Sequence, residues 1–262
     1  MRILKISLLA LIYVFIVAVL VIRYDLGYLL SLFLFFGIPS LYFSIRRPEV
    51  VKKSLAYALL FSLPVVFVFD YMAHVSHTWY VPSEIGIRIW NAFPLDQLFW
   101  GFLFFYLIIV GYNSFMVKKY DAKILSPNFK YLIAIIILLG SAFAVILTTH
   151  KEWLVINHFY GLFVFGVMFL PTLLVLIFNP QPKEKVAKIF LVALLSVILS
   201  LNYEYSALKT GQWFFNGEHY LGWIYFFDVK FPIEELLFMF FAIPGTICVY
   251  EFFSQSTGKS HT

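Results

Sequence analysis

The sequence predicts an all-α, polytopic transmembrane helix bundle of about eight spans, arranged as two parallel four-helix repeats. Of its 262 residues, 62% are hydrophobic and only 13% are charged, whereas a soluble domain has about 45–50% apolar and about 25% charged residues. The mean hydropathy is +0.90. This composition argues against a globular cytosolic enzyme and a disordered chain. It also argues against a nucleic-acid-binding module, because the basic residues lie in loops between apolar runs.

Apolar runs of about 18 or more residues are typical of transmembrane helices, and they define the expected elements. The first run is longer than a typical signal-peptide core, and no small-x-small cleavage site follows Ile22, so we count it as a span. The expected spans are Ile3–Ile22, Tyr24–Ile45, Ser54–Met72, Phe93–Val117, Lys130–Thr148, His158–Phe178, Ala187–Ala207 and Phe231–Phe253.

The basic residues predict one orientation for these spans. Most of the 19 Lys and Arg residues fall at the N-terminus and in the loops on the same side. Short loops rich in Lys and Arg remain in the cytoplasm. We therefore expect an integral protein of the cell membrane with both termini cytoplasmic. The aromatic loops Ala73–Ala92 and Leu208–Lys230 would lie on the opposite face.

The two halves of the sequence share residues in the same order, which predicts an internal repeat. The separation between matched residues grows from 132 to 138, as small loop insertions would produce. The matches are Tyr28 with Tyr160, Pro39 with Pro171, Asp70 with Glu204, Trp79 with Trp213, Gly86 with Gly222 and Pro94 with Pro232. We place the repeats at residues 1–128 and 129–262. Four spans each would make the repeats parallel, and the matched prolines Pro39 and Pro171 are expected to interrupt equivalent helices, where transporters often build sites.

Acidic residues begin the fourth and the eighth span. Glu234 and Glu235 follow Pro232, whereas Asp96 and Gln97 follow Pro94. Proline and acids are ordinary at helix starts. However, carboxylates in lipid-embedded helices are costly and usually face a protein interior or cavity.

Burial and a neighbouring carboxylate both favour the protonated form of a carboxyl. Asp70 and Glu204 end the preceding spans on the same side, so each half gathers acids at one membrane face. This arrangement favours proton-driven chemistry on an apolar substrate.

The aromatic loops could serve that chemistry, because ring faces stabilise cations. An aromatic belt at the membrane interface is the alternative explanation. Our candidates for substrate contact are Trp79, Trp213, Phe214, Trp223 and, in the last span, Phe238.

These residues, taken in order, resemble the lycopene cyclase domain, the flavin-independent family of integral-membrane carotenoid cyclases. The second half carries Glu204-x8-Trp213, Gly222 and then Pro232-Ile233-Glu234-Glu235-Leu236-Leu237-Phe238. The first half carries Asp70-x8-Trp79, Gly86 and then Pro94-Leu95-Asp96-Gln97. The resemblance extends from about Tyr24 to Phe253. The family's Pro-x-Glu-Glu motif is intact only in the second half, which leaves open whether the first half is catalytic.

The resemblance implies a lycopene β-cyclase-like isomerase (an intramolecular lyase) of carotenoid biosynthesis that uses no cofactor and no metal. A protonated carboxyl adds a proton to the terminal double bond of a linear carotenoid. The neighbouring double bond attacks the resulting cation, and a base then removes a proton to leave a β-ionone ring. Glu234 or Glu235 would be the acid, and Glu204 and Asp70 would relay protons or act as base. Asp96 could also act as an acid, whereas Gln97 cannot.

The expected partner is a linear carotenoid such as lycopene in the bilayer. A homo-oligomer or a complex with carotenoid enzymes stays open, as do the exact substrate, the ring type and the number of rings. The alternative function is that of a non-catalytic membrane subunit that binds a carotenoid or lipid, or scaffolds such an enzyme. Metal chemistry is disfavoured because the closest histidine pair, His74 and His77, is only two ligands. No G-x-G-x-x-G motif points to a nucleotide cofactor.

Overall fold

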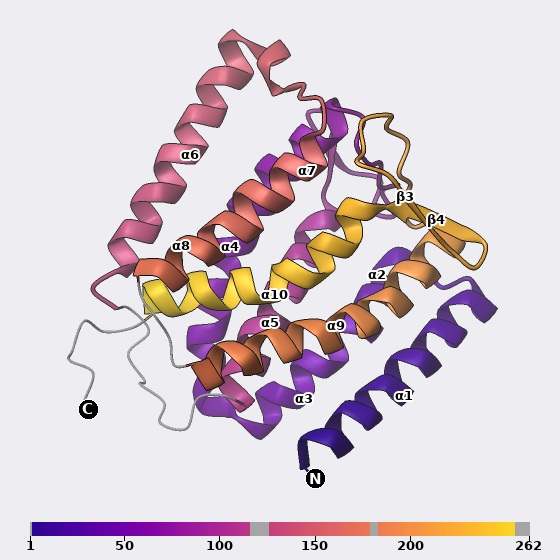
Figure 1. Cartoon of the computed structure of the whole chain (residues 1–262). Coiled ribbons are helices and arrows are strands. Elements are labelled where there is room, and N and C mark those ends of the chain that lie inside the picture. The colour runs from indigo at the N-terminus through magenta and orange to yellow at the C-terminus, as the bar shows by residue number, and fades with distance from the viewer. Residues whose placement is uncertain (1, 116–125, 179–182, 255–262) are drawn as a thin grey trace.

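The computed structural model describes residues 2–115, 126–178 and 183–254, and over these ranges the chain is a bundle of apolar helices (Figure 1). Within this part of the chain, seven helical segments are long and apolar enough to cross a membrane. They are Tyr28–Arg46, α4 (Pro48–Val75), α5 (Asp96–Phe115), α6 (Phe129–Thr149), Phe159–Phe178, α9 (Lys183–Lys209) and α10 (Ile233–Ser254). The helix α1 (Arg2–Tyr24) contains the expected span Ile3–Ile22, but its apolar part, Leu8–Tyr24, is shorter than these seven segments, so the described residues hold seven of the eight expected spans. The all-α prediction is confirmed.

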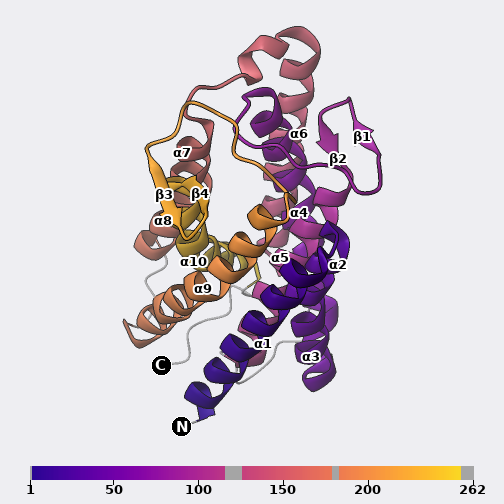
Figure 2. The same cartoon turned by 90° about the vertical axis from the view of Figure 1, so that its right-hand side faces the viewer.

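The helices α4, α5 and α10 are the most buried, and the other helices pack around them. The helix α1 packs along α9, whereas α6 stands at the opposite edge of the bundle and meets the rest through α4 and α10 (Figures 1 and 2). The rings of Phe143 on α6 and Tyr71 on α4 lie 5.5 Å apart. Two short hairpins lie at one end of the bundle, and the N-terminal end of α1 lies at the other (Figure 2). All the loops that carry the acid motifs therefore gather at a single end.

The two hairpins shift the starts of the acidic spans. One pairs β1 (Arg88–Ile89) with β2 (Phe93–Pro94), and the other pairs β3 (Trp223–Phe226) with β4 (Val229–Pro232), both antiparallel. The sequence assigned Phe93 and Phe231 to helices. In the structure each Phe-Pro pair ends a strand, where the missing proline N–H costs no ladder hydrogen bond, and the helix starts after it. Conversely, α4 and α9 begin before their expected starts, and the expected end at residue 117 lies outside the described residues.

The matched prolines do not interrupt their helices, which corrects the sequence prediction. Tyr28–Arg46 runs as α2 (Tyr28–Leu32), a π-helical turn η1 (Phe33–Gly37) and α3 (Ile38–Arg46). The equivalent segment runs as α7 (Phe159–Phe163), a π-helical turn η3 (Val164–Phe169) and α8 (Leu170–Phe178). Proline cannot donate to the preceding turn and its ring crowds the carbonyl there. A wider π-turn directly before Pro39 and Pro171 gives that ring room, so the helix continues.

The two halves of the chain also meet between the hairpin loops. Tyr80 and Phe214 form an isolated antiparallel bridge, in which each backbone N–H donates to the other's carbonyl at 2.9 Å. The Trp79 ring lies 5.0 Å from that of Tyr160. Segments far apart in sequence are thus interleaved at this end. The division into repeats at residue 128 stays a prediction of sequence organisation.

A buried polar cluster ties the helices together at the opposite end. Glu251 on α10 accepts from the Tyr112 hydroxyl of α5, and the Lys185 ammonium of α9 lies 2.5 Å from the same carboxylate. Nearby, the Asn113 amide nitrogen donates to the Tyr250 hydroxyl at 3.0 Å. Three helices are therefore joined by a paired charge and its hydrogen bonds.

Candidate functional site

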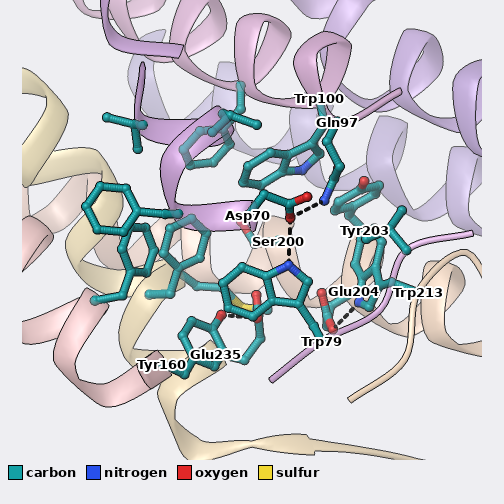
Figure 3. A pocket seen from close by; sticks show the side chains of 18 of the residues that line it. Asp70, Trp79, Gln97, Trp100, Tyr160, Ser200, Tyr203, Glu204, Trp213 and Glu235 are labelled. Carbon is teal, nitrogen blue, oxygen red and sulfur yellow. Dashed lines mark hydrogen bonds between the residues drawn. The ribbon is translucent and has the colours of Figure 1, made fainter. Parts of the chain in front are cut away.

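A cavity of about 120 Å³ lies inside the bundle, just below the hairpin loops. Both halves of the chain line it, and its wall is mostly aromatic and aliphatic, with four acid or amide side chains (Figure 3). The lining residues that can form hydrogen bonds or hold charge are Tyr28, Asp70, Trp79, Gln97, Trp100, Tyr160, Ser200, Tyr203, Glu204, Trp213 and Glu235. No Lys, Arg or His is among the described lining residues. The described wall itself therefore supplies no cation to these carboxyls, and Arg88, which interacts electrostatically with Asp70, lies outside it.

The first half contributes a connected set of four side chains to the wall. Trp79 Nε1 donates to Asp70 Oδ1 at 2.7 Å, and Gln97 Nε2 donates to the same oxygen at 3.1 Å. The Tyr28 hydroxyl donates to Gln97 Oε1. Trp79 reaches back to Asp70 because the chain reverses after α4, with His77 in the left-handed conformation at φ +54°.

The second half contributes the equivalent four positions with different bonds. Trp213 Nε1 donates to Glu204 Oε1 at 3.0 Å, and the Tyr160 hydroxyl donates to Glu235 Oε2. The reversal after α9 uses Gly211 at φ +68°, 134 residues after His77. Glu204 is fully buried beside the cavity. Where the first half has an amide at Gln97, this half has a second carboxyl at Glu235.

Two of the candidate acids, Asp96 and Glu234, lie outside the cavity wall and bind loop backbone instead. Asp96 accepts from the backbone N–H of Glu84 at 2.8 Å and of Ile85 at 3.3 Å. Glu234 Oε1 accepts from the backbone N–H of Leu221 at 2.7 Å. Both side chains are completely buried. Each therefore fastens the loop before its hairpin to the first turn of the following helix, and of the adjacent pair only Glu235 reaches the cavity.

The candidate aromatic residues divide in the same way. Trp79, Trp213 and Phe238 line the cavity. Phe214 is 47% exposed and forms the backbone bridge with Tyr80 instead. Trp223 lies in β3, where the Lys230 ammonium sits 4.6 Å from its ring centroid. The last two therefore shape the hairpin loops rather than the cavity.

The structure adds wall residues that the sequence did not single out as site residues. Tyr28 and Tyr160 had been noted only as matched positions of the repeat, and that match was the available signal for their role. The Tyr203 hydroxyl is buried with no hydrogen-bond partner among the described residues. Trp100 and Phe104 extend the wall as a stacked pair, with ring centroids 5.3 Å apart, and Phe104 lies 5.7 Å from Phe238.

The fold and the site define a polytopic helical membrane bundle with a carboxyl-lined apolar cavity. Across the described ranges, no group of three or more His, Cys, Asp or Glu side chains could hold a metal ion. Comparisons of the chain with models of protein families, with curated proteins and with solved structures find no match. The carboxyls in the cavity wall are groups that can give and take protons, in surroundings that are mostly apolar.

Proposed function

We propose that this protein is a carotenoid cyclase that closes the linear end group of a lycopene-type carotenoid into a β-ionone ring. The reaction is a redox-neutral isomerisation that needs a proton donor, a proton acceptor and a surface that tolerates a carbocation. The proposal rests on the cavity wall together with the ordered acid, tryptophan and proline motifs of the sequence. It would make the protein an isomerase of carotenoid biosynthesis.

The observation that carries the proposal is the placement of Glu235. This carboxyl lines an apolar cavity, and its described hydrogen-bond partner is the Tyr160 hydroxyl. A hydroxyl both donates and accepts, so it stays bonded whether or not Glu235 holds a proton. Glu204 lies in the same wall. A protonated Glu235 beside a second carboxyl is suited to give its proton to a double bond in the cavity.

The aromatic wall is suited to the cation that follows. A tertiary cation forms when the terminal double bond takes the proton, and the neighbouring double bond then attacks it to close the six-membered ring. Ring faces attract cations within about 6 Å. Trp79, Trp100 and Phe238 supply aromatic rings to the cavity wall. They can stabilise the cation without supplying a nucleophile that would trap it.

The cavity is of the size that holds a benzene-sized part of an end group. Its volume of about 120 Å³ is close to that of an engineered apolar cavity of about 150 Å³ that holds a benzene molecule. One six-membered ring can occupy the site while the rest of the polyene lies outside it. The bilayer would hold that remainder, and the basic loops would place both termini in the cytoplasm.

The test is to express the full chain in bacteria that accumulate lycopene and to analyse their pigments by chromatography and mass spectrometry. The wild type is expected to convert lycopene into a product of unchanged mass with the retention and spectrum of a cyclic carotenoid. Glu235→Gln is expected to abolish the conversion. Glu234→Gln is the matched control, since it changes the neighbouring carboxyl, which holds the loop, and should keep ring formation per folded molecule.

Two outcomes would refute the proposal: conversion that survives in Glu235→Gln, or lycopene unchanged by wild-type protein shown to be in the membrane. The second outcome would favour a non-catalytic subunit that binds carotenoid or lipid. This second candidate function is kept because the first half has the amide Gln97 at the position where the second half has an acid. Lycopene that copurifies unchanged with the wild-type protein would then identify it.

A further inference from the structure

Four positions of the cavity wall are matched between the two halves, and their hydrogen bonds differ at one of them. Tyrosine, tryptophan and a buried carboxyl occur in both sets. The fourth position is Gln97 in the first half and Glu235 in the second. Because all of these residues line the same cavity, the two sets face a common substrate position.

The bonds to Asp70 leave no place for a proton on one of its oxygens. Oδ1 accepts from both Trp79 Nε1 and Gln97 Nε2. An indole N–H and an amide NH₂ are donors only, and the Tyr28 hydroxyl holds Gln97 by its Oε1 so that the NH₂ faces Asp70. The other oxygen, Oδ2, has no hydrogen-bond partner among the described residues. Asp70 is therefore arranged as an acceptor with one free oxygen.

The bonds to Glu235 are of the opposite kind. Its described partner, the Tyr160 hydroxyl, can accept as well as donate. No amide donor stands between Glu235 and Glu204, at the place where Gln97 bridges to Asp70 in the first half. The second set can therefore carry an exchangeable proton that the first set cannot carry in the same way.

We propose that the two sets divide the proton transfers of a single reaction: Glu235 gives the proton and Asp70 takes one back, with Gln97 as the positioning residue that keeps Asp70 an acceptor. This inference rests on the proposed function and assigns its base. Gln97, the amide that departs from the family motif, would then have a role in the reaction, because it keeps Asp70 an acceptor.

The placement of Trp79 supports this division. Its Nε1 is bonded to Asp70, while its ring lies 5.0 Å from that of Tyr160, which is bonded to Glu235 (Figure 3). Trp79 thus contacts both sets, Asp70 through its indole N–H and the Tyr160 partner of Glu235 through its ring.

The steps balance. The Glu235 proton adds to the terminal double bond, and the neighbouring double bond supplies the electron pair that closes the ring. A proton on a carbon beside the new cation then leaves to Asp70 Oδ2, and its electron pair forms the ring double bond. Between turnovers, the proton returns from Asp70 to Glu235 through water or Glu204. Substrate and product have the same composition.

The test uses membranes that hold the full chain and lycopene made in ordinary water, which are then transferred to heavy water so that synthesis of the carotenoid adds no deuterium. Wild-type protein should introduce one deuterium per ring. Asp70→Asn should lower ring formation at least tenfold, while deuterium still enters the recovered linear carotenoid, because Glu235 can protonate the double bond and take the proton back. Glu235→Gln should give neither rings nor exchange. Asp96→Asn is the matched control, since that acid binds loop backbone outside the cavity.

Gln97→Leu tests the positioning role and also serves if Asp70→Asn does not accumulate. It removes the N–H donor and should raise the ratio of exchanged linear carotenoid to ring product at least threefold. A purely structural effect would lower both together and leave this ratio unchanged.

Ring formation at the wild-type rate in Asp70→Asn, or an exchange as low as in Glu235→Gln with the protein folded, would overturn the assignment of the base. A wild type that gives neither rings nor deuterium would instead overturn the proposed function itself.

Discussion

Replacing Glu235 with Gln should stabilise the fold while it abolishes ring formation. The matched position in the first half shows how a glutamine is bonded there. The oxygen of Gln97 accepts from Tyr28, and its nitrogen donates to Asp70 at 3.1 Å. A glutamine at position 235 can keep the bond from Tyr160 and donate to Glu204 in the same way. Whenever Glu235 has given up its proton, the wild type holds two acceptors in the wall of one cavity, whereas the variant holds a donor and an acceptor at all times.

The expected gain follows from the new bond. A hydrogen bond to a charged group contributes about 1.5–3 kcal/mol. For chains of about 150–250 residues, each kcal/mol shifts Tm by roughly 2–4 °C. We therefore expect Glu235→Gln to raise Tm by several degrees, and the reverse change, Gln97→Glu, to lower it by a similar amount.

The assay is thermal unfolding of the purified full chain in detergent, followed by circular dichroism, for the wild type and both variants. Wild-type protein prepared in the same detergent is the reference for each change in Tm. The reasoning is refuted if Glu235→Gln unfolds at or below the wild-type Tm, or if Gln97→Glu leaves Tm unchanged.

Three further changes test other parts of the structure. Gly101→Ala should destabilise the protein by about 1–3 kcal/mol, because a Cβ there would clash with Val66 across the α4–α5 contact. Gly140→Ala is the control and should not destabilise it, because a Cβ at that position has nothing within 4 Å. Thermal unfolding of the two variants measures the difference. Glu251→Gln should lower the free energy of unfolding by about 2–3 kcal/mol, and so lower Tm, without changing ring type. Breaking a buried ion pair usually costs about 3–5 kcal/mol, and the cost is smaller here because the lysine partner of Glu251 is 29% exposed. Hydrogen bonds from Lys209 and Tyr205 of α9 lower the pKa of Asp228 below its usual value of 3.8. The stability that it contributes is present above pH 4 and is lost as the pH falls through the lowered pKa, so Asp228→Asn should flatten the acid limb of a pH-stability curve.

The helices were the most predictable part of the fold, because long apolar runs are read directly from composition. Their ends were less predictable. Pro94 and Pro232 look like residues of a first helical turn, yet they end strands of two and four residues, which are too short to show an alternating pattern. The π-helical turns before Pro39 and Pro171 leave no sequence signal beyond the prolines themselves.

The candidate site was predictable at the level of the motif but not of the individual atom. Neighbouring residues on a helix point about 100° apart, so the sequence could not say which of Glu234 and Glu235 faces a cavity. That choice depends on the backbone N–H of Leu221, which binds Glu234 and comes from a loop whose path no local pattern fixes. The pairing of Trp79 with Tyr160 likewise joins distant parts of the chain.

The cross-packing of the halves has a consequence for how such a chain can evolve. Trp79 of one half rests on Tyr160 of the other, and Tyr28 lies edge-on to Trp213 at 6.3 Å. A substitution in either half therefore affects side chains of the other, so the two halves cannot change independently. A change at position 97 has to be compatible with the residue at position 235. In genetic terms, positions 97 and 235 should show strong epistasis.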